Sequence, residues 1–154
     1  MSFSGEVKEE LEQNISSSRH CQIAELAAMV CYSGRIEQDG RIEQDGRGHV
    51  SFTIQSENEK VIRKCFTLLE KTFNINKVAV QGKGRILSDD RTEDKVIQAL
   101  HLGKREDGSI LLQTPVNSLL IKNSCCARAF LRGAFLSIGS MSDPEKSYHL
   151  EFVC

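Results

Sequence analysis

The side chains best suited to bind a ligand lie in two short stretches, and their chemistry suits contact with phosphate. Residues 49–55 alternate strictly between polar and apolar types. Residues 77–87 carry basic and amide side chains around two glycines. The candidate DNA-binding set from these stretches is His49, Ser51, Thr53, Gln55, Lys77, Gln81, Lys83 and Arg85. Lysine and arginine attract phosphates, and hydroxyl and amide groups hydrogen-bond to them.

A second interpretation of the same residues remains open. A solvated sheet face explains the alternation of residues 49–55 about as well, and basic clusters often protect a sheet edge or keep it soluble. The formal net charge of the 154-residue chain is -1, so the whole chain lacks the basic signature of a nucleic-acid-binding domain. Any contact with DNA must therefore come from a local patch or from another part of the protein.

The residue spacing does not predict a metal site or a cofactor. The chain has six cysteines and four histidines, but no two cysteines have the Cys-x-x-Cys spacing of zinc sites. The run Gly82-Lys83-Gly84 is too short for a phosphate-binding loop and does not open a helix. A cysteine–histidine nucleophile pair stays open, although nothing local argues for one. We therefore expect no catalytic residue, no metal and no cofactor, and cytoplasmic, reduced thiols.

Two apolar stretches of the same length must position these residues. Residues 26–34 read Leu-Ala-Ala-Met-Val-Cys-Tyr-Ser-Gly, and residues 131–139 read Leu-Arg-Gly-Ala-Phe-Leu-Ser-Ile-Gly. A helix that is apolar all round must be buried on more than one side. Small residues in both stretches would let the two backbones pack closely, and Gly34 and Gly139 predict helix ends in the left-handed cap conformation.

The remaining elements follow from hydrophobic periodicity and capping residues. The predicted helices are 5–15 capped by Ser4, 19–33 capped by Ser18, 56–73 opened by a capping box, 93–101, a short one through Ile121, and 125–138 capped by Ser124. The predicted strands are 49–55, two within 77–87, the segment 110–112, and residues 148–153. Residues 35–40 and 41–46 are identical copies of Arg-Ile-Glu-Gln-Asp-Gly. We favour a duplication in a loop tip, with a lengthened β-hairpin as the alternative.

The two nine-residue stretches resemble the LAGLIDADG signature of homing endonucleases. The segments Ser2–Leu11, Cys125–Phe135 and Asp143–Phe152 are also similar to the WhiA family of bacterial DNA-binding regulators. This resemblance runs along the whole chain. It implies an α+β, LAGLIDADG homing-endonuclease-like fold, with one complete αββαββα unit and the start of a second. It also implies that a family member would continue past Cys154 with the rest of the second repeat and a helix-turn-helix domain.

In active homing endonucleases the eighth motif position is an acid that binds a divalent metal. Here those positions are Ser33 and Ile138. Magnesium sites need carboxylate oxygens, so the resemblance implies the fold without the nuclease.

The resemblance implies a non-catalytic DNA-binding transcriptional regulator of sporulation or cell division, located in the cytoplasm on the nucleoid. The alternative is a protein-interaction module or a truncated, non-functional fragment. We expect a helical extension over residues 1–18, a first repeat over 19–123 and an incomplete second repeat over 124–154. DNA is the expected partner, though contacts from this region are weak. A protein partner or self-association through the exposed helix and strand of the second repeat is also expected, and a membrane is not.

Overall fold

Helices and short antiparallel strands alternate along the chain. The computed structural model describes residues 2–42, 48–54, 56, 59–73, 79–81, 85–87, 99–100, 103–106, 109–112 and 118–153. The helices are α1 (Phe3–Gln13), α2 (Arg19–Ser33), α3 (Glu59–Phe73) and α5 (Ser124–Ile138), with a short 3-10 helix η1 (Ser118–Ile121). The strands are β1 (Gly34–Ile42), β2 (Gly48–Ile54), β3 (Ala79–Gln81), β4 (Arg85–Leu87), β5 (Gly103–Glu106), β6 (Ser109–Leu112), β7 (Gly139–Met141) and β8 (Leu150–Phe152).

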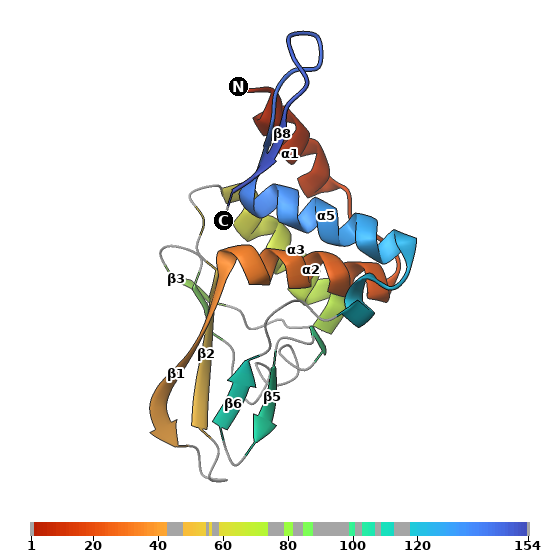
Figure 1. The fold of residues 1–154 in the computed structure, drawn as a ribbon. Helices are drawn as coiled ribbons and strands as arrows, with labels where there is room; N and C mark the ends of the chain where they lie inside the picture. Colours follow the sequence, from red (N-terminus) through yellow and green to blue (C-terminus); the bar gives the residue numbers. More distant parts are fainter. Residues whose placement is uncertain are drawn as a thin grey trace.

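The helices α2 and α5 lie side by side at the centre of the molecule (Figure 1). Each has 15 residues, and their bounds confirm the two predicted signature helices. Most of α2 is buried, as its apolar composition requires. Gly133 in α5 packs against the α2 backbone, and a Cβ there would lie 3.0 Å from the Cβ of Ala28. The predicted close approach of two helices with small residues is therefore confirmed.

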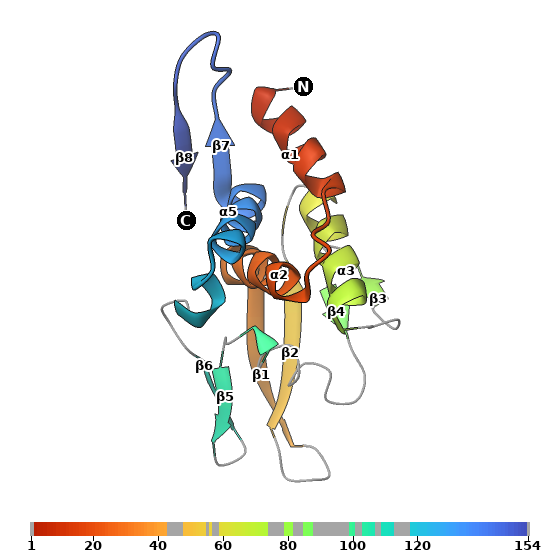
Figure 2. The same ribbon diagram turned by 90° about the vertical axis from the view of Figure 1, so that its right-hand side faces the viewer.

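A four-stranded antiparallel sheet lies below the helices, with strand order β1-β2-β4-β3 (Figures 1 and 2). α2 continues directly into β1. Ile54, at the end of β2, is fully buried in one core cluster with Leu26 of α2 and Leu68 of α3. The helices α2 and α3 therefore pack against this sheet at Ile54, and the α+β class predicted from the sequence is confirmed.

Two further hairpins complete the described structure. β5 pairs with β6, and β7 pairs with β8, both antiparallel. β7 and β8 follow α5 as β1 and β2 follow α2, and they project past α1 (Figure 2). α1 is tied to β7 through Ser4, whose Oγ donates to the Met141 carbonyl at 2.8 Å and accepts from its amide at 2.7 Å.

Several predicted helix ends were wrong. Ser2 rather than Ser4 caps α1, because the Ser2 side chain accepts from the Gly5 amide at 3.1 Å while Ser4 bonds to β7. α1 accordingly spans Phe3–Gln13 instead of 5–15. Asn123 rather than Ser124 is the N-cap residue of α5, and Ser18 caps α2 by position without a side-chain hydrogen bond.

The two glycines that follow the signature helices have extended backbones rather than left-handed ones. Gly34 has φ -96° and Gly139 has φ -88°. A Cβ on Gly34 would lie 2.9 Å from Cα of Val30, and one on Gly139 would lie 2.7 Å from Cα of Phe135. Glycine is therefore required here by close contact with the preceding helical turn, not by a positive φ.

The first copy of the tandem repeat lies in a strand instead of a loop tip. Residues 35–40 are part of β1, an edge strand, and the register with β2 shifts between Gln38 and Ile42. The helix predicted over 93–101 lies largely outside the described residues, although Leu100 is buried in the core. Gly103 begins β5. Among the described residues, every helix is too short or too polar to span a lipid bilayer.

Candidate functional site

One row of residues crosses all four strands of the sheet. Arg35 of β1 pairs with Thr53 of β2, and Thr53 pairs with Arg85 of β4. Arg85 in turn pairs with Gln81 of β3. Directly paired residues in an antiparallel sheet lie on the same face. Two arginines, a threonine and a glutamine therefore occupy one continuous line across one face.

That face is the one turned away from the helices. Successive residues of a strand lie on opposite faces, so Phe52 lies opposite Thr53, on the same face as Ile54. Ile54 is fully buried in the core formed with α2 and α3. The neighbouring row, Ile36, Phe52, Ile86 and Val80, is apolar and lies on the same face as Ile54. The polar row consequently lies on the sheet face opposite Ile54.

The structure brings together part of the predicted DNA-binding set. Thr53, Gln81 and Arg85 are neighbours in the polar row. His49 and Ser51 lie further along β2, on the same face by alternation. The other three predicted residues lie outside the described part of the chain: Gln55, Lys77 and Lys83. The DNA-binding role of all eight residues stays a prediction.

Sequence reasoning missed Arg35. It opens the first copy of the tandem repeat, which we assigned to a loop, and only the strand register places it beside Thr53. The register also pairs Glu37 with Ser51, so an acid enters the same face. A carboxylate there repels phosphate and weakens any interaction with DNA. The face is therefore mixed in charge, with its two arginines in the row nearest the helices.

The tips of the two signature helices carry no acid. Ser33 is the last residue of α2 and Ile138 the last residue of α5. Both are half-buried, and both occupy the eighth position of the nine-residue motif. A serine hydroxyl is a poor magnesium ligand and an isoleucine side chain is none.

The opposite ends of the same helices bring together four side chains that can bind metal. His20 and Cys21 are the second and third residues of α2, and Cys125 and Cys126 are the second and third residues of α5. Their ligand atoms all lie within 4.8 Å of one another. The spacing rules could not find this group, because Cys125 lies 105 positions after His20. The cysteines of the described residues are free thiols.

The three thiols of this group differ in acidity. Burial raises the pKa of the Cys21 thiol to about 11, and burial also raises the pKa of Cys126. The pKa of Cys125 is lowered, first by a hydrogen bond with Cys21 and further by hydrogen bonds with Cys126. Negative charge in the group is therefore favoured on Cys125, the more accessible of the three.

Comparison with known proteins identifies the family of this chain. The family model of the WhiA N-terminal LAGLIDADG-like domain matches residues 19–88, and that of the WhiA LAGLIDADG-like domain matches residues 127–154. A relative from Lachnoclostridium phytofermentans, named "Probable cell division protein WhiA", is 41% identical over 164 residues, which cover 99% of this chain. One of the same name from Lachnospira eligens is 38% identical and covers 100% of this chain.

This chain belongs to the WhiA family. It spans about half the length of these relatives, 50% of the first and 49% of the second. The crystal structure of the N-terminal LAGLIDADG domain of WhiA is similar, with a TM-score of 0.51 at 24% identity, over 98% of this chain and 66% of that one. Full-length WhiA from Thermatoga maritima matches with a TM-score of 0.50 at 24% identity, over 99% of this chain and 44% of that one. These likenesses confirm the LAGLIDADG fold.

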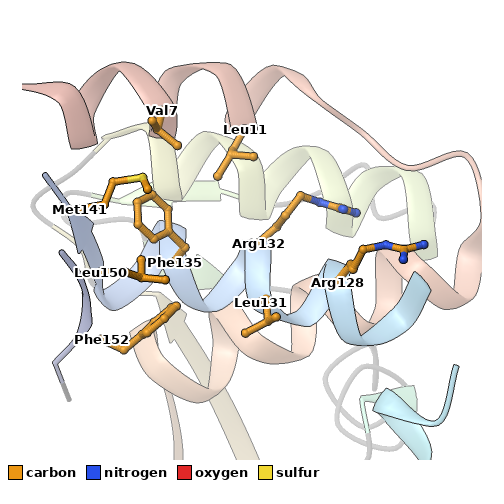
Figure 3. A pocket seen from close by; sticks show the side chains of 9 residues that line it. All are labelled: Val7, Leu11, Arg128, Leu131, Arg132, Phe135, Met141, Leu150 and Phe152. Atoms are coloured by element: carbon orange, nitrogen blue, oxygen red, sulfur yellow. The ribbon is translucent and has the colours of Figure 1, made fainter. Parts of the chain in front are cut away.

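An apolar groove runs along α5 of this WhiA-family chain. It has a volume of about 400 Å³ and lies between α1, α5 and the β7–β8 hairpin (Figure 3). Val7, Leu11, Leu131, Phe135, Met141, Leu150 and Phe152 line it, with Arg128 and Arg132 at one end. Leu131 opens the second signature and is 56% exposed, whereas Leu26 opens the first and is 0% exposed. The core that α3 completes beside α2 thus has no counterpart beside α5 among the described residues.

A buried ion pair joins α2 to α3. Lys64 Nζ lies 3.1 Å from Glu25 Oε1, without the alignment of a hydrogen bond, and both side chains are 0% exposed. Lys64 Nζ also donates to the carbonyls of Leu11 at 2.6 Å and Asn14 at 2.5 Å. Burial raises the pKa of Glu25 and lowers the pKa of Lys64, more strongly than their mutual attraction opposes it. Lys64 thus joins α3 both to Glu25 of α2 and to the C-terminal end of α1.

Proposed function

We propose that this chain contacts DNA through the face of its four-stranded sheet that lies opposite Ile54. In this proposal it is a non-catalytic part of a transcriptional regulator that acts in bacterial cell division or sporulation, in the cytoplasm and on the nucleoid. The name of the relatives, "Probable cell division protein WhiA", supports the process. The polar row across the sheet supports the contact with DNA.

The observation that carries the proposal is the pairing of Arg35 and Arg85 with Thr53 between them. Neighbouring strands lie about 4.8 Å apart, so the two arginines stand about 10 Å apart across β2. That separation lets each contact its own phosphate, while the threonine and Gln81 offer a hydroxyl and an amide to the backbone between. Arginine binds phosphate with two parallel hydrogen bonds, which favours this arrangement.

The proposed interaction is weak and depends on salt. The chain has a net charge of -1, and Glu37 lies on the same sheet face as the arginines. Each neutralised phosphate contributes about 0.9 to the slope of log affinity against log salt concentration. Two arginine contacts therefore account for a slope of about 2.

Fluorescence anisotropy with a labelled, mixed-sequence DNA duplex tests the proposal over a range of salt concentrations. The double substitution Arg35→Gln/Arg85→Gln should reduce the slope by about 2 and weaken binding to all sequences alike. The matched control is Lys122→Gln/Lys146→Gln, which removes the same charge from exposed positions outside the sheet. Equal losses in both variants, with native circular dichroism, would assign the binding to overall charge and reject the sheet face.

The non-catalytic part of the proposal rests on Ser33 and Ile138 at the two helix tips. Supercoiled plasmid incubated with the chain and Mg²⁺ should stay intact, because no carboxylate there can hold the metal. Magnesium-dependent nicking or linearisation that survives repurification of the chain would reject this part while leaving the fold assignment untouched.

A second candidate function is supported by the apolar groove beside α5. Leu131, Leu150 and Phe152 are exposed there, at 56%, 58% and 39%. Contiguous exposed apolar surface of this kind mediates protein–protein contact. In this alternative the chain associates with a copy of itself or with a protein partner through α5 and β8.

A further inference from the structure

We propose that His20, Cys21, Cys125 and Cys126 form a Cys3His zinc site that joins the N-terminal ends of α2 and α5. Three sulfurs surround the His20 Nδ1 atom. Cys126 Sγ lies 3.1 Å away, Cys21 Sγ 3.5 Å and Cys125 Sγ 3.9 Å. With Zn–S bonds of about 2.3 Å and a Zn–N bond of about 2.0 Å, the nitrogen–sulfur edges of a zinc tetrahedron measure about 3.5 Å. The observed distances bracket that value.

The number and type of ligands also fit zinc. Three thiolates and one imidazole make one of the standard sets of structural zinc sites, which are four-coordinate and tetrahedral. Hard cations such as Mg²⁺ or Ca²⁺ prefer oxygen ligands, and this group offers none. Cys21 and Cys126 are buried and Cys125 is half-buried, whereas His20 is exposed. The ion would thus lie at the surface end of the helix interface, with a path for entry past the imidazole.

The two helix N-termini favour the negative charge of such a site. α2 and α5 run side by side in the same direction (Figure 1), so their partly positive ends meet. Neither first turn contains an acidic residue, and neither N-cap side chain accepts a hydrogen bond from the helix. Zn²⁺ with three thiolates carries a net charge of -1. The complex therefore opposes the helix dipoles, and its sulfurs can accept from the open amides.

The two helices place their metal ligands at equivalent positions. Each helix has 15 residues and contributes its second and third. Cys21, Ala24, Cys126 and Ala129 form a small buried cluster of their own, flanked by Cys125 and Phe130. The ligands thus stand on two rigid helices against an apolar layer that excludes water, as preorganised metal sites require. In this proposal the metal holds the signature helices together at the end opposite Gly34 and Gly139.

Titration of the reduced, metal-free chain with Co²⁺ under anaerobic conditions tests the site. We expect one equivalent to bind with a sulfur-to-cobalt charge-transfer band and the visible bands of tetrahedral cobalt, and Zn²⁺ to displace it. The variant Cys21→Ser/Cys126→Ser should bind at least about 100-fold more weakly. Cys31→Ser, which removes an exposed cysteine outside the group, should leave the spectrum unchanged.

Absence of the charge-transfer band in the unsubstituted chain would overturn the proposal, as would a band that persists in the double variant. Thiol alkylation followed by peptide mass mapping provides a readout that does not depend on the variants folding. Zn²⁺ should slow the alkylation of Cys125, the most accessible ligand thiol, and leave that of Cys31 unchanged. Equal alkylation rates of Cys125 with and without Zn²⁺ would reject the site.

Discussion

Gly133 in α5 lies against the backbone carbonyl of Glu25 in α2, so closely that a Cβ at position 133 would overlap the carbonyl oxygen. This contact sets the distance between the two signature helices. It explains why the second motif has glycine at its third position, where the first motif has Ala28. The close packing of α2 and α5 thus depends on the absence of a side chain at position 133.

Replacing Gly133 with alanine should therefore destabilise the chain. The added methyl group must push the helices apart, which costs about 1–3 kcal/mol in a packed core. Urea denaturation followed by circular dichroism measures the loss. Adding Ala28→Gly should recover only part of it, because the Glu25 carbonyl remains in the way after the Ala28 Cβ, 3.0 Å from the new methyl, is removed. A Gly133→Ala variant as stable as the parent would contradict the contact.

Removing one partner of the buried ion pair should destabilise the chain more than replacing both partners with uncharged side chains. Lys64→Met leaves Glu25 buried beside Arg132, whose Nε is 3.8 Å away, and removes the donor from two backbone carbonyls. We expect a loss of about 3–5 kcal/mol in the free energy of unfolding. Glu25→Gln/Lys64→Met should be less destabilised than Lys64→Met alone, because no unpaired carboxylate remains. Urea denaturation of the two single variants and the double variant measures these losses in the free energy of unfolding. Additive losses would show that the two side chains are not coupled.

The same pair predicts a pH dependence. Burial raises the pKa of Glu25 from its ordinary value of 4.5, so between 4.5 and the raised value the folded chain holds a proton that the unfolded chain releases. The free energy of unfolding should consequently fall as the pH rises through this window. Glu25→Gln lacks this titration. The free energy of unfolding of the parent minus that of the variant should therefore fall as the pH rises from 4.5. A rise in this quantity over the same window would contradict the direction of the shift.

The apolar groove predicts association at high concentration. Leu131→Lys places a charge in the centre of the groove and should lower the weight-average mass measured by light scattering. Leu119→Lys is the matched control, because Leu119 is 63% exposed but does not line the groove. A monomeric parent at high concentration would reject self-association, and equal effects of the two substitutions would reject the groove as its site.

Helix positions could be predicted closely because their signals are local. The bounds 19–33 of the first signature helix follow from apolar periodicity and a terminal glycine, and the structure gives Arg19–Ser33. Cap assignment failed at Ser4 because two serines compete near one helix end, and the choice depended on Met141, far along the chain. The strand over residues 35–40 was missed because the Asp-Gly pairs of the repeat indicate turns, while pairing with β2 outweighs them.

Some features of the candidate sites could likewise be predicted from the sequence, and others depended on tertiary contacts. Residue types alone identified Thr53, Gln81 and Arg85 as a polar set, and the absence of acids at Ser33 and Ile138 was visible without coordinates. The row that joins Arg35 to Arg85 was not visible, because strand register is fixed by backbone pairing between segments distant in sequence. The group of His20, Cys21, Cys125 and Cys126 was missed for the same reason, since helix packing across 105 positions brings it together.

The sequence by itself determined the family, the two glycine-ended helices and the lack of metal-binding acids at their tips, because each depends on residue identity and short-range spacing. Only the tertiary structure decided which residues share a sheet face, which thiols meet, and why Gly34 and Gly139 must be glycine. Those relationships depend on distances between segments far apart in the chain. Steric exclusion and packing set such distances, and local propensity does not encode them.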